Sequence, residues 1–211
     1  MSLIELRSVA CDRGGRRLFE GLDLVLEPGG AALVTGSNGI GKSSLIRVAA
    51  GLLKPGAGTV ERRGAAALAD ESLALDLRLP LRRALAFWAG MDSPNRVAAL
   101  TDRDGSVEAG SAVHAWASGL EFALDRMGIG GLAAVPVRML STGQRKRAVL
   151  ARVIASGAPI WLLDEPANGL DGDGQSRLES AIAAHRAGGG AVLAASHQSL
   201  GLPGAARVAL E

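Results

Sequence analysis

Apolar positions along the chain follow three patterns, and each pattern predicts a different kind of element. Alternation of apolar and polar residues over 3–9 and 22–26 predicts two half-buried strands, with a turn at 12–15 between them. Short continuous apolar runs predict further strands, some of them weak candidates, at 31–35, 59–62, 65–69, 160–163, 191–196 and 206–210. Helical spacing predicts helices over 42–50, 81–91, 111–127, 142–155 and 172–185.

The order of these segments predicts an α/β core that carries a helical insertion. Strands and helices alternate in the first and last parts of the chain, as they do around parallel sheets. The middle differs, because two helical patterns there are separated by a polar segment, 92–110. We therefore expect one domain over 1–211, with a core of about 1–80 and 141–211 and a helical subdomain of about 81–140. The chain has no internal repeat, so it offers a single nucleotide-binding unit.

Composition narrows the class of protein without identifying it. Hydrophobic residues make up 48% of the 211 residues, which is enough for a sizeable core. Lys and Arg total 23 against 21 Asp and Glu, so the net charge of +2 gives no reason to expect a nucleic-acid partner. The single cysteine, Cys11, excludes an internal disulfide and fits a reducing compartment. No run approaches the ~18 apolar residues that cross a bilayer, so work at a membrane would need a partner.

A glycine-rich stretch follows the third predicted strand and leads into a helix. Its sequence, GSNGIGKSS, has the form G-x-x-x-x-G-K-S of a phosphate-binding loop, and its members are Gly36, Ser37, Asn38, Gly39, Ile40, Gly41, Lys42, Ser43 and Ser44. The glycines allow the backbone to approach phosphates, and the helix N-terminus favours negative charge. Lys42 is expected to reach the β- and γ-phosphates, Ser43 to bind Mg²⁺, and Ser44 to donate near the α-phosphate. A glycine-rich turn without a ligand would explain the glycines but not the lysine and hydroxyl after them.

Two adjacent acids end a buried strand. The apolar run 160–163 is followed by Asp164 and Glu165, and burying two carboxylates is costly unless they face a cation or a polar ligand. Successive side chains of a strand point in opposite directions, so the two acids have different roles. Asp164 fits the Mg²⁺ side, and Glu165 fits a general base beside the γ-phosphate. The alternative is that both acids only cap the helix that follows Pro166.

Two further candidates have simple structural explanations when each is taken alone. Ser141 stands before a predicted helix, where serine is a common N-cap, although with Gly143 and the helix N-terminus it could form a second anion site. His197 follows Ser196 at the end of an apolar strand, and an isolated histidine is usually structural. His114 and His185 have no special context and are interpreted as surface residues.

Together, five stretches in one fixed order resemble the ATP-binding subunits of ABC transporters. They are Gly36–Ser44, Leu140–Gln144, Ile160–Pro166, Gly169–Asp171 and Ser196-His197. The resemblance implies a P-loop NTPase core of the ABC-ATPase type with an N-terminal antiparallel β portion and a helical subdomain insert. It also implies ATP hydrolysis with Mg²⁺ and an integral membrane transporter subunit as partner.

The resemblance also implies roles that the residues alone do not. Ser141, Gly143 and Gln144 match the signature that contacts the γ-phosphate of ATP bound to the opposite subunit. Asp171 matches a loop that crosses to that subunit, and His197 matches the family's switch histidine at the γ-phosphate. A head-to-tail pair of chains with two ATP molecules between them follows from this match.

The chain departs from the family pattern at three places. Thr142 stands where the signature usually has glycine. No tyrosine is present to stack on adenine, and Arg13 falls in that region, where it either stacks on the base or is a solvated turn residue. The glutamine that usually follows the third core strand is missing, and Glu71 or Ser72 falls there instead. Coupling to the membrane partner is therefore expected to differ.

Within the family, several stretches resemble the haem-exporter ATP-binding subunits of the cytochrome c maturation system. They are Arg16–Gly29, Leu140–Arg152 and Gly188–Gln198, together with Arg13 and the short chain. This branch implies a peripheral position on the cytoplasmic face of the bacterial inner membrane, with ATP hydrolysis tied to haem export or to release of a haem-loaded chaperone. The alternatives are another small exporter, a soluble ABC ATPase without a transport role, or a module that closes on ATP without hydrolysing it.

Overall fold

The computed structural model describes residues 1–70, 75–92 and 119–210. The chain divides into two compact units, which are treated separately below. The first unit comprises Met1–Glu71, Pro159–Ala167 and Ile182–Glu211, and the second comprises Ser72–Ala158 and Asn168–Ala181.

The first unit begins with a three-stranded antiparallel sheet. It consists of β1 (Ile4–Arg13), β2 (Arg16–Leu26) and β4 (Ala57–Arg62) in the order β2-β1-β4. Gly14 and Gly15 have φ of 57° and 74° and form a two-residue turn, which is the tight hairpin connection that glycine favours. Because this turn needs only two residues, both strands are longer than predicted and bring Arg13 to the end of the hairpin.

A five-stranded parallel sheet forms the rest of this unit. Its strands are β3 (Ala31–Thr35), β5 (Ala66–Ala69), β6 (Ile160–Asp164), β7 (Ala191–Ala195) and β8 (Ala206–Ala209), in the order β5-β6-β7-β3-β8. The strands start and end within one residue of the predicted positions. β7 lies between β3 and β6, so the segments that follow these three strands emerge side by side at one edge of the sheet.

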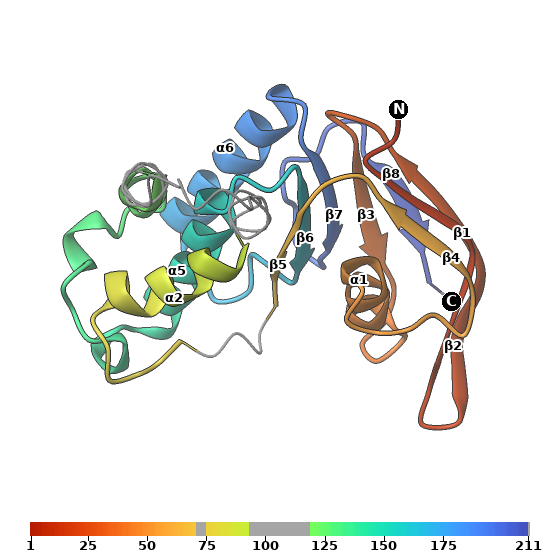
Figure 1. The fold of residues 1–211 in the computed structure, drawn as a ribbon, viewed down its shortest axis with the longest axis horizontal. Coiled ribbons are helices and arrows are strands. Elements are labelled where there is room, and N and C mark those ends of the chain that lie inside the picture. Colours follow the sequence, from red (N-terminus) through yellow and green to blue (C-terminus); the bar gives the residue numbers. More distant parts are fainter. Residues whose placement is uncertain (71–74, 93–118, 211) are drawn as a thin grey trace, which may run out of the picture. The chain divides into compact units, whose positions relative to one another are not determined.

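Helix α1 (Lys42–Ala50) lies between the two sheets (Figure 1). Leu45 and Ile46 of α1 are fully buried in a core that contains residues of both sheets, such as Leu6 and Leu193. The helix ends at Gly51, whose φ of 75° is the left-handed C-cap conformation that glycine favours. Truncating such a buried leucine or isoleucine to alanine typically costs about 2–5 kcal/mol, so α1 and the loop before it are held firmly.

One histidine was interpreted wrongly from the sequence. His185 of α6 (Gly172–Ala187) is not a plain surface residue, because its ring stacks on Trp161 of β6 with 3.9 Å between centroids and 9° between planes. Burial lowers the pKa of His185 below its ordinary value. His114 lies outside the described residues.

The second unit is helical. It contains α2 (Leu81–Asp92), a helical stretch over 119–126, α5 (Thr142–Ala155) and α6 up to Ala181, with short 3₁₀ helices η1 (Gly130–Leu132) and η2 (Val137–Met139). Its buried side chains include Leu81, Leu85, Leu120 and Leu124. The two 3₁₀ helices were not predicted, since a single turn leaves no periodicity to detect. Within the described residues, no helix is both long enough and apolar enough to span a bilayer.

Candidate active site

The phosphate loop has a backbone that only glycine adopts easily. Gly36, Gly39 and Gly41 have φ of 144°, 79° and 124°. A Cβ at Gly36 would lie 2.7 Å from the carbonyl oxygen of Leu210, and one at Gly41 would lie 3.1 Å from Cβ of Leu18. Gly41 also precedes α1 and has no side chain to cap it, so the first N–H groups of α1 are left for another acceptor.

Lys42 is turned back onto the loop that precedes it. It is only 7% exposed, and its Nζ donates to the carbonyl oxygens of Gly36 (2.8 Å) and Ser37 (3.1 Å) and lies 2.9 Å from Nε2 of His197. Two of the three N–H donors of its ammonium group therefore have backbone acceptors. The lysine side chain therefore lies over the loop, where the glycines open the backbone.

Eight of the predicted site residues line one cavity of about 440 Å³ within the first unit. Its walls are Arg13, Leu18, Asn38, Gly39, Gly41, Lys42, Ser43, Ser44 and Glu165. Arg13 comes from the hairpin of the antiparallel sheet, whereas Glu165 comes from the end of β6. The structure thus brings together residues more than 100 positions apart in the sequence, and the volume falls within the usual range for small-molecule sites, about 300–1,000 Å³.

The two acids at the end of β6 differ in conformation and in exposure. Asp164 is the last residue of β6 and is 5% exposed. Glu165 has φ of 46°, a left-handed conformation that is rare for residues with a side chain. Its N–H donates to the carbonyl oxygen of Ala195 in β7 (2.8 Å), which fixes the bend. Strained backbone of this kind is concentrated at functional sites, where the rest of the fold enforces it.

His197 connects the acids to the phosphate loop. Its backbone N–H donates to Oε2 of Glu165 (3.3 Å), and its Nε2 lies 3.5 Å from Oε1 of the same carboxylate. The same Nε2 lies 2.9 Å from Oδ1 of Asn38 and 2.9 Å from Nζ of Lys42. The three segments that follow β3, β6 and β7 therefore meet through one imidazole ring.

The signature residues lie in the second unit, at the start of α5. Oγ of Ser141 accepts from the N–H of Gln144 (3.2 Å), and Oε1 of Gln144 accepts from the N–H of Ser141 (2.9 Å), which is a complete capping box. The hydroxyl hydrogen of Ser141 is still available to donate, as an anion would require. A Cβ at Gly143 would lie 3.0 Å from the carbonyl oxygen of Gly169, so this glycine allows the GLD segment to approach.

Asp171 is held within its own unit. Its Oδ1 accepts from the N–H of Gly174 (2.9 Å), which caps α6, and also from the guanidinium of Arg147. These two interactions hold the pKa of Asp171 below its ordinary value. Arg147 also donates to Asp173 (2.9 Å), and sequence reasoning missed this arginine, whose only signal is its place one helical turn after Gln144.

Two sequence interpretations fall on residues that are not described. Glu71 and Ser72, the candidates for the missing glutamine, lie outside the described residues. Asp70, immediately before them, is 7% exposed, and its Oδ2 lies 3.7 Å from Nη2 of Arg47 in α1.

The donor set at the cavity fits Mg²⁺ bound together with phosphates. The described residues contain no group of three or more His, Cys, Asp or Glu side chains that could hold a metal ion by themselves. Mg²⁺ normally takes one or two protein oxygens and completes its shell with phosphate oxygens and water. The exposed hydroxyl of Ser43, which lines the cavity, is an oxygen of that kind. The carboxylate of Asp164 is another, at the end of β6 beside Glu165, although Asp164 does not itself line the cavity.

The profile of a known family, described as "ABC transporter", matches residues 19–168, which include the phosphate loop, the signature and both acids. The chain belongs to the ABC transporter family. Membership makes it an ABC-type ATPase, an ATP-binding subunit that hydrolyses ATP.

Two curated ABC relatives share more than half of their aligned residues with it. The cytochrome c biogenesis ATP-binding export protein CcmA of Sphingopyxis alaskensis is 56% identical over 95% of this chain and 93% of the relative. The protein of the same name from Novosphingobium aromaticivorans is 56% identical over 92% of this chain and 88% of the relative.

Solved structures support the ABC ATPase fold. An ATP-binding subunit of an ABC transporter superposes with a TM-score of 0.76, covering 93% of this chain and 80% of that chain at 20% identity. The predicted fold class is confirmed, including the antiparallel β portion.

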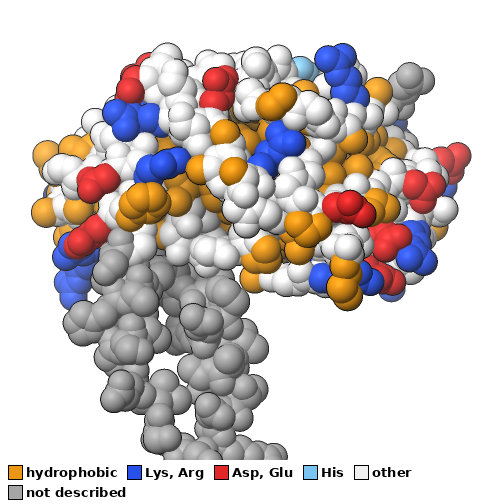
Figure 2. Space-filling view, turned by 90° about the horizontal axis from the view of Figure 1, so that it is seen from above, with side chains coloured by type: hydrophobic (Ala, Val, Ile, Leu, Met, Phe, Trp, Pro, Cys, Tyr) orange, Lys and Arg blue, Asp and Glu red, His pale blue; other side chains and the backbone are white. Residues whose placement is uncertain are grey.

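On the face shown in Figure 2, basic and acidic side chains of the described residues are interspersed and form no continuous basic band. That nucleic acid is not a partner stays a prediction.

Proposed function

We propose that this chain is the ATP-hydrolysing subunit of a membrane ABC complex that acts in cytochrome c maturation, on the cytoplasmic face of the bacterial inner membrane. One observation supports its catalytic part above all others: Lys42, Glu165 and His197 converge where three parallel strands end. The names of the 56% identical relatives, cytochrome c biogenesis ATP-binding export proteins, support the biological process.

ATP would bind along the cavity with its phosphates in the glycine loop. Lys42 would exchange its contacts with the loop carbonyls and His197 for the β- and γ-phosphates, while the N–H groups of residues 36–44 donate to the phosphate oxygens. Arg13 is exposed at the hairpin and lines the same cavity, which supports the proposal that its guanidinium stacks on adenine.

Ser43 and Asp164 would hold Mg²⁺, Ser43 directly and Asp164 through water. When bound, the ion neutralises charge on the β- and γ-phosphates. Both residues belong to rigid elements, since Ser43 lies in the first turn of α1 and Asp164 ends β6.

Glu165 would act as the general base of hydrolysis. Water attacks the γ-phosphorus, the bond to the bridging oxygen of the β-phosphate breaks, and ADP leaves. The carboxylate of Glu165 accepts the proton of the attacking water, a contribution that is typically worth about 10²–10⁴ in rate. Lys42 and the imidazole of His197 stabilise charge on the γ-phosphate oxygens throughout.

A second copy of the chain would complete each site. In this head-to-tail pair, Ser141, Gly143 and Gln144 of one chain face the γ-phosphate bound by the other, and Asp171 lies at the crossing loop. The capped N-terminus of α5 with a free hydroxyl hydrogen on Ser141 is suited to an anion.

Integral membrane subunits would be the other partners, with docking close to Glu71 and Ser72. We propose that hydrolysis energises haem export or release of a haem-loaded chaperone. Co-expression with the cognate membrane subunit should move the chain to the membrane fraction and raise its ATP turnover.

The decisive variant is Glu165→Gln, measured in the same preparations. It should keep ATP binding, lose turnover by about 10²-fold or more, and accumulate a nucleotide-bound dimer. Hydrolysis near the wild-type rate would contradict the general-base role. Fast turnover that no membrane component changes would contradict the membrane role.

A further inference from the structure

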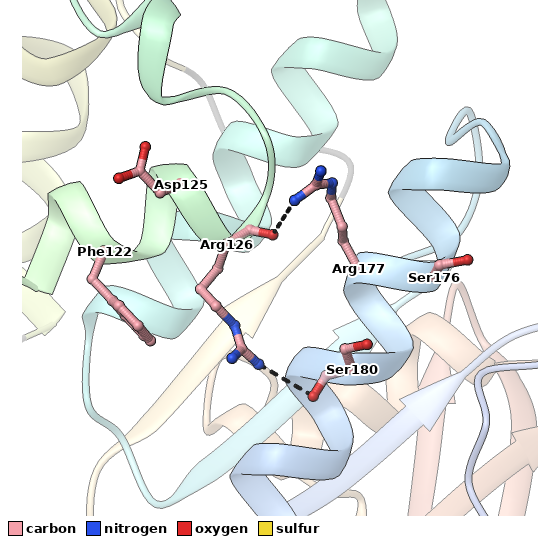
Figure 3. A pocket seen from close by; sticks show the side chains of 6 residues that line it. All are labelled: Phe122, Asp125, Arg126, Ser176, Arg177 and Ser180. Carbon is pink, nitrogen blue, oxygen red and sulfur yellow. Dashed lines mark hydrogen bonds between the residues drawn. The ribbon is translucent and has the colours of Figure 1, made fainter.

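A groove in the second unit contains none of the residues assigned to ATP. It is a cavity of about 450 Å³ between the helical stretch 119–126 and α6, lined by Phe122, Asp125, Arg126, Ser176, Arg177 and Ser180 (Figure 3). All six residues belong to the same compact unit, so the groove is a property of that unit alone.

Arg126 is held in place by uncharged partners. Its guanidinium carbon lies 5.7 Å from the ring centroid of Phe122, and its Nη2 donates to the carbonyl oxygen of Ser180 (3.3 Å). Across the part of the chain that the structure describes, no carboxylate pairs with Arg126. Arg177 differs, because its Nε donates to both carboxylate oxygens of Asp173 (3.0 and 2.8 Å). The charge of Arg126 is thus pre-oriented but not neutralised.

The one acid that lines the groove does not change this. Figure 3 shows the carboxylate of Asp125 pointing away from the Arg126 guanidinium. It lies instead over Gly130, where any added Cβ would collide with Oδ1 of Asp125. The side of the groove that Arg126 and Ser180 form is therefore cationic, with hydrogen-bond donors to spare.

Phe122 adds an apolar wall beside that charge. It is 59% exposed, although the leucines on the same helix, Leu120 and Leu124, are buried. Arginine and aromatic side chains are enriched among the residues that dominate binding energy at protein interfaces. An exposed ring that already orders a guanidinium offers a partner both apolar area and a fixed charge at little entropic cost.

We propose that this groove binds an acidic segment of the membrane subunit, with an Asp or Glu carboxylate on Arg126 and a neighbouring apolar side chain on Phe122. This inference rests on the proposed function, which puts such a subunit beside this chain. Charge complementarity identifies the occupant as anionic, and the exposed ring identifies it as partly apolar. None of the residues assigned to the ATP-sandwich pair lines the groove.

The test places a photo-crosslinker in the groove of the full chain. Phe122 is replaced by p-benzoylphenylalanine, the chain is co-produced with its membrane subunit, and crosslinked peptides are identified by mass spectrometry after irradiation. The expected adduct joins this chain to a membrane-subunit peptide that contains Asp or Glu. Adding Arg126→Glu should lower the adduct yield about tenfold, and Arg126→Gln by less. Arg83→Glu, at an exposed arginine of α2, should leave the yield within about twofold.

Each outcome bears on a separate statement. Arg126→Glu should not change the basal ATPase activity of the isolated chain, because no ATP-binding residue lies in the groove. Three outcomes would show that the groove proposal is wrong while the proposed function stands, provided that the chain still associates with the membrane subunit. The adduct is absent, it joins this chain to a second copy or to itself, or its yield is unchanged by Arg126→Glu. If the unsubstituted chain never associates with the membrane subunit, both are wrong.

Discussion

The left-handed backbone of Glu165 makes it possible to separate what this residue does for catalysis from what it costs in stability. The pair of variants Glu165→Gly and Glu165→Ala removes the same carboxylate and the same acceptor for the N–H of His197 (3.3 Å). Only the backbone preference differs between them. At φ of 46°, alanine remains strained and glycine does not.

The expected difference follows from two opposing contributions. A left-handed conformation costs a residue with a Cβ roughly 1–2 kcal/mol. Glycine relieves this strain, but it loses more conformational entropy on folding than alanine does, which offsets about 0.5–1 kcal/mol of the stability gained. Glu165→Gly should therefore be more stable than Glu165→Ala by about 1 kcal/mol, or about 2–4 °C in Tm for a chain of this length. Both variants should lose turnover by about 10²-fold or more.

Thermal unfolding of the nucleotide-free chain and steady-state ATP hydrolysis measure the two effects. The matched control is the same pair at Glu179 inside α6, where glycine should instead be less stable than alanine by about 1 kcal/mol. If the glycine variant is less stable than the alanine variant at Glu165 as well as at Glu179, the strain argument is wrong. If either Glu165 variant hydrolyses ATP normally, the base has been misassigned.

Three further predictions concern nucleotide capture, pairing and pH. Lys42→Ala should weaken ATP binding by about 10²-fold or more in calorimetry, through two lost charge-assisted hydrogen bonds. Its apo Tm should barely change, and Lys54→Ala, at an exposed lysine, should change neither quantity. Mixing inactive Lys42→Ala chains with inactive Ser141→Ala chains should restore ATP hydrolysis, because each heterodimer keeps one intact site. If heterodimers verified by native mass spectrometry recover no activity, the head-to-tail pair is contradicted. Because burial lowers the pKa of His185, the unfolded state binds protons more readily, so stability should fall as pH drops through about 6.5. His185→Gln should flatten that part of a pH-stability profile, and an unchanged slope would refute the assignment.

The sequence predicted most of the fold because its signals were local and strong. Continuous apolar runs in a buried parallel sheet mark β3, β6 and β7 nearly to the residue, and Gly51 marks the end of α1. The hairpin was underestimated, since the period-two pattern weakens from Cys11 to Leu18, where the side chains are mostly polar and exposed.

The sequence predicts which residues belong to the site but not which of them contact one another. Strand order cannot be read from periodicity, so the position of β7 between β3 and β6, which brings His197 to Lys42, had to come from the structure. The same holds for the ring stacking of His185 on Trp161, whose residues are far apart in sequence. Arg147 was missed because helix periodicity shows which face a residue occupies but not which carboxylates approach from another segment.

The committed donors of Lys42 have a consequence for ligand discrimination. Its Nζ donates to the carbonyl oxygens of Gly36 and Ser37, so a ligand that bound at Lys42 would replace these hydrogen bonds. Such an exchange is favourable when the new acceptors carry more negative charge than a peptide carbonyl or an imidazole. A nucleoside offers no such charge, a monophosphate offers it at one phosphate, and a triphosphate offers it at two adjacent phosphates. The exchange at Lys42 would therefore favour ligands that carry charged phosphates over uncharged ones, whatever their base.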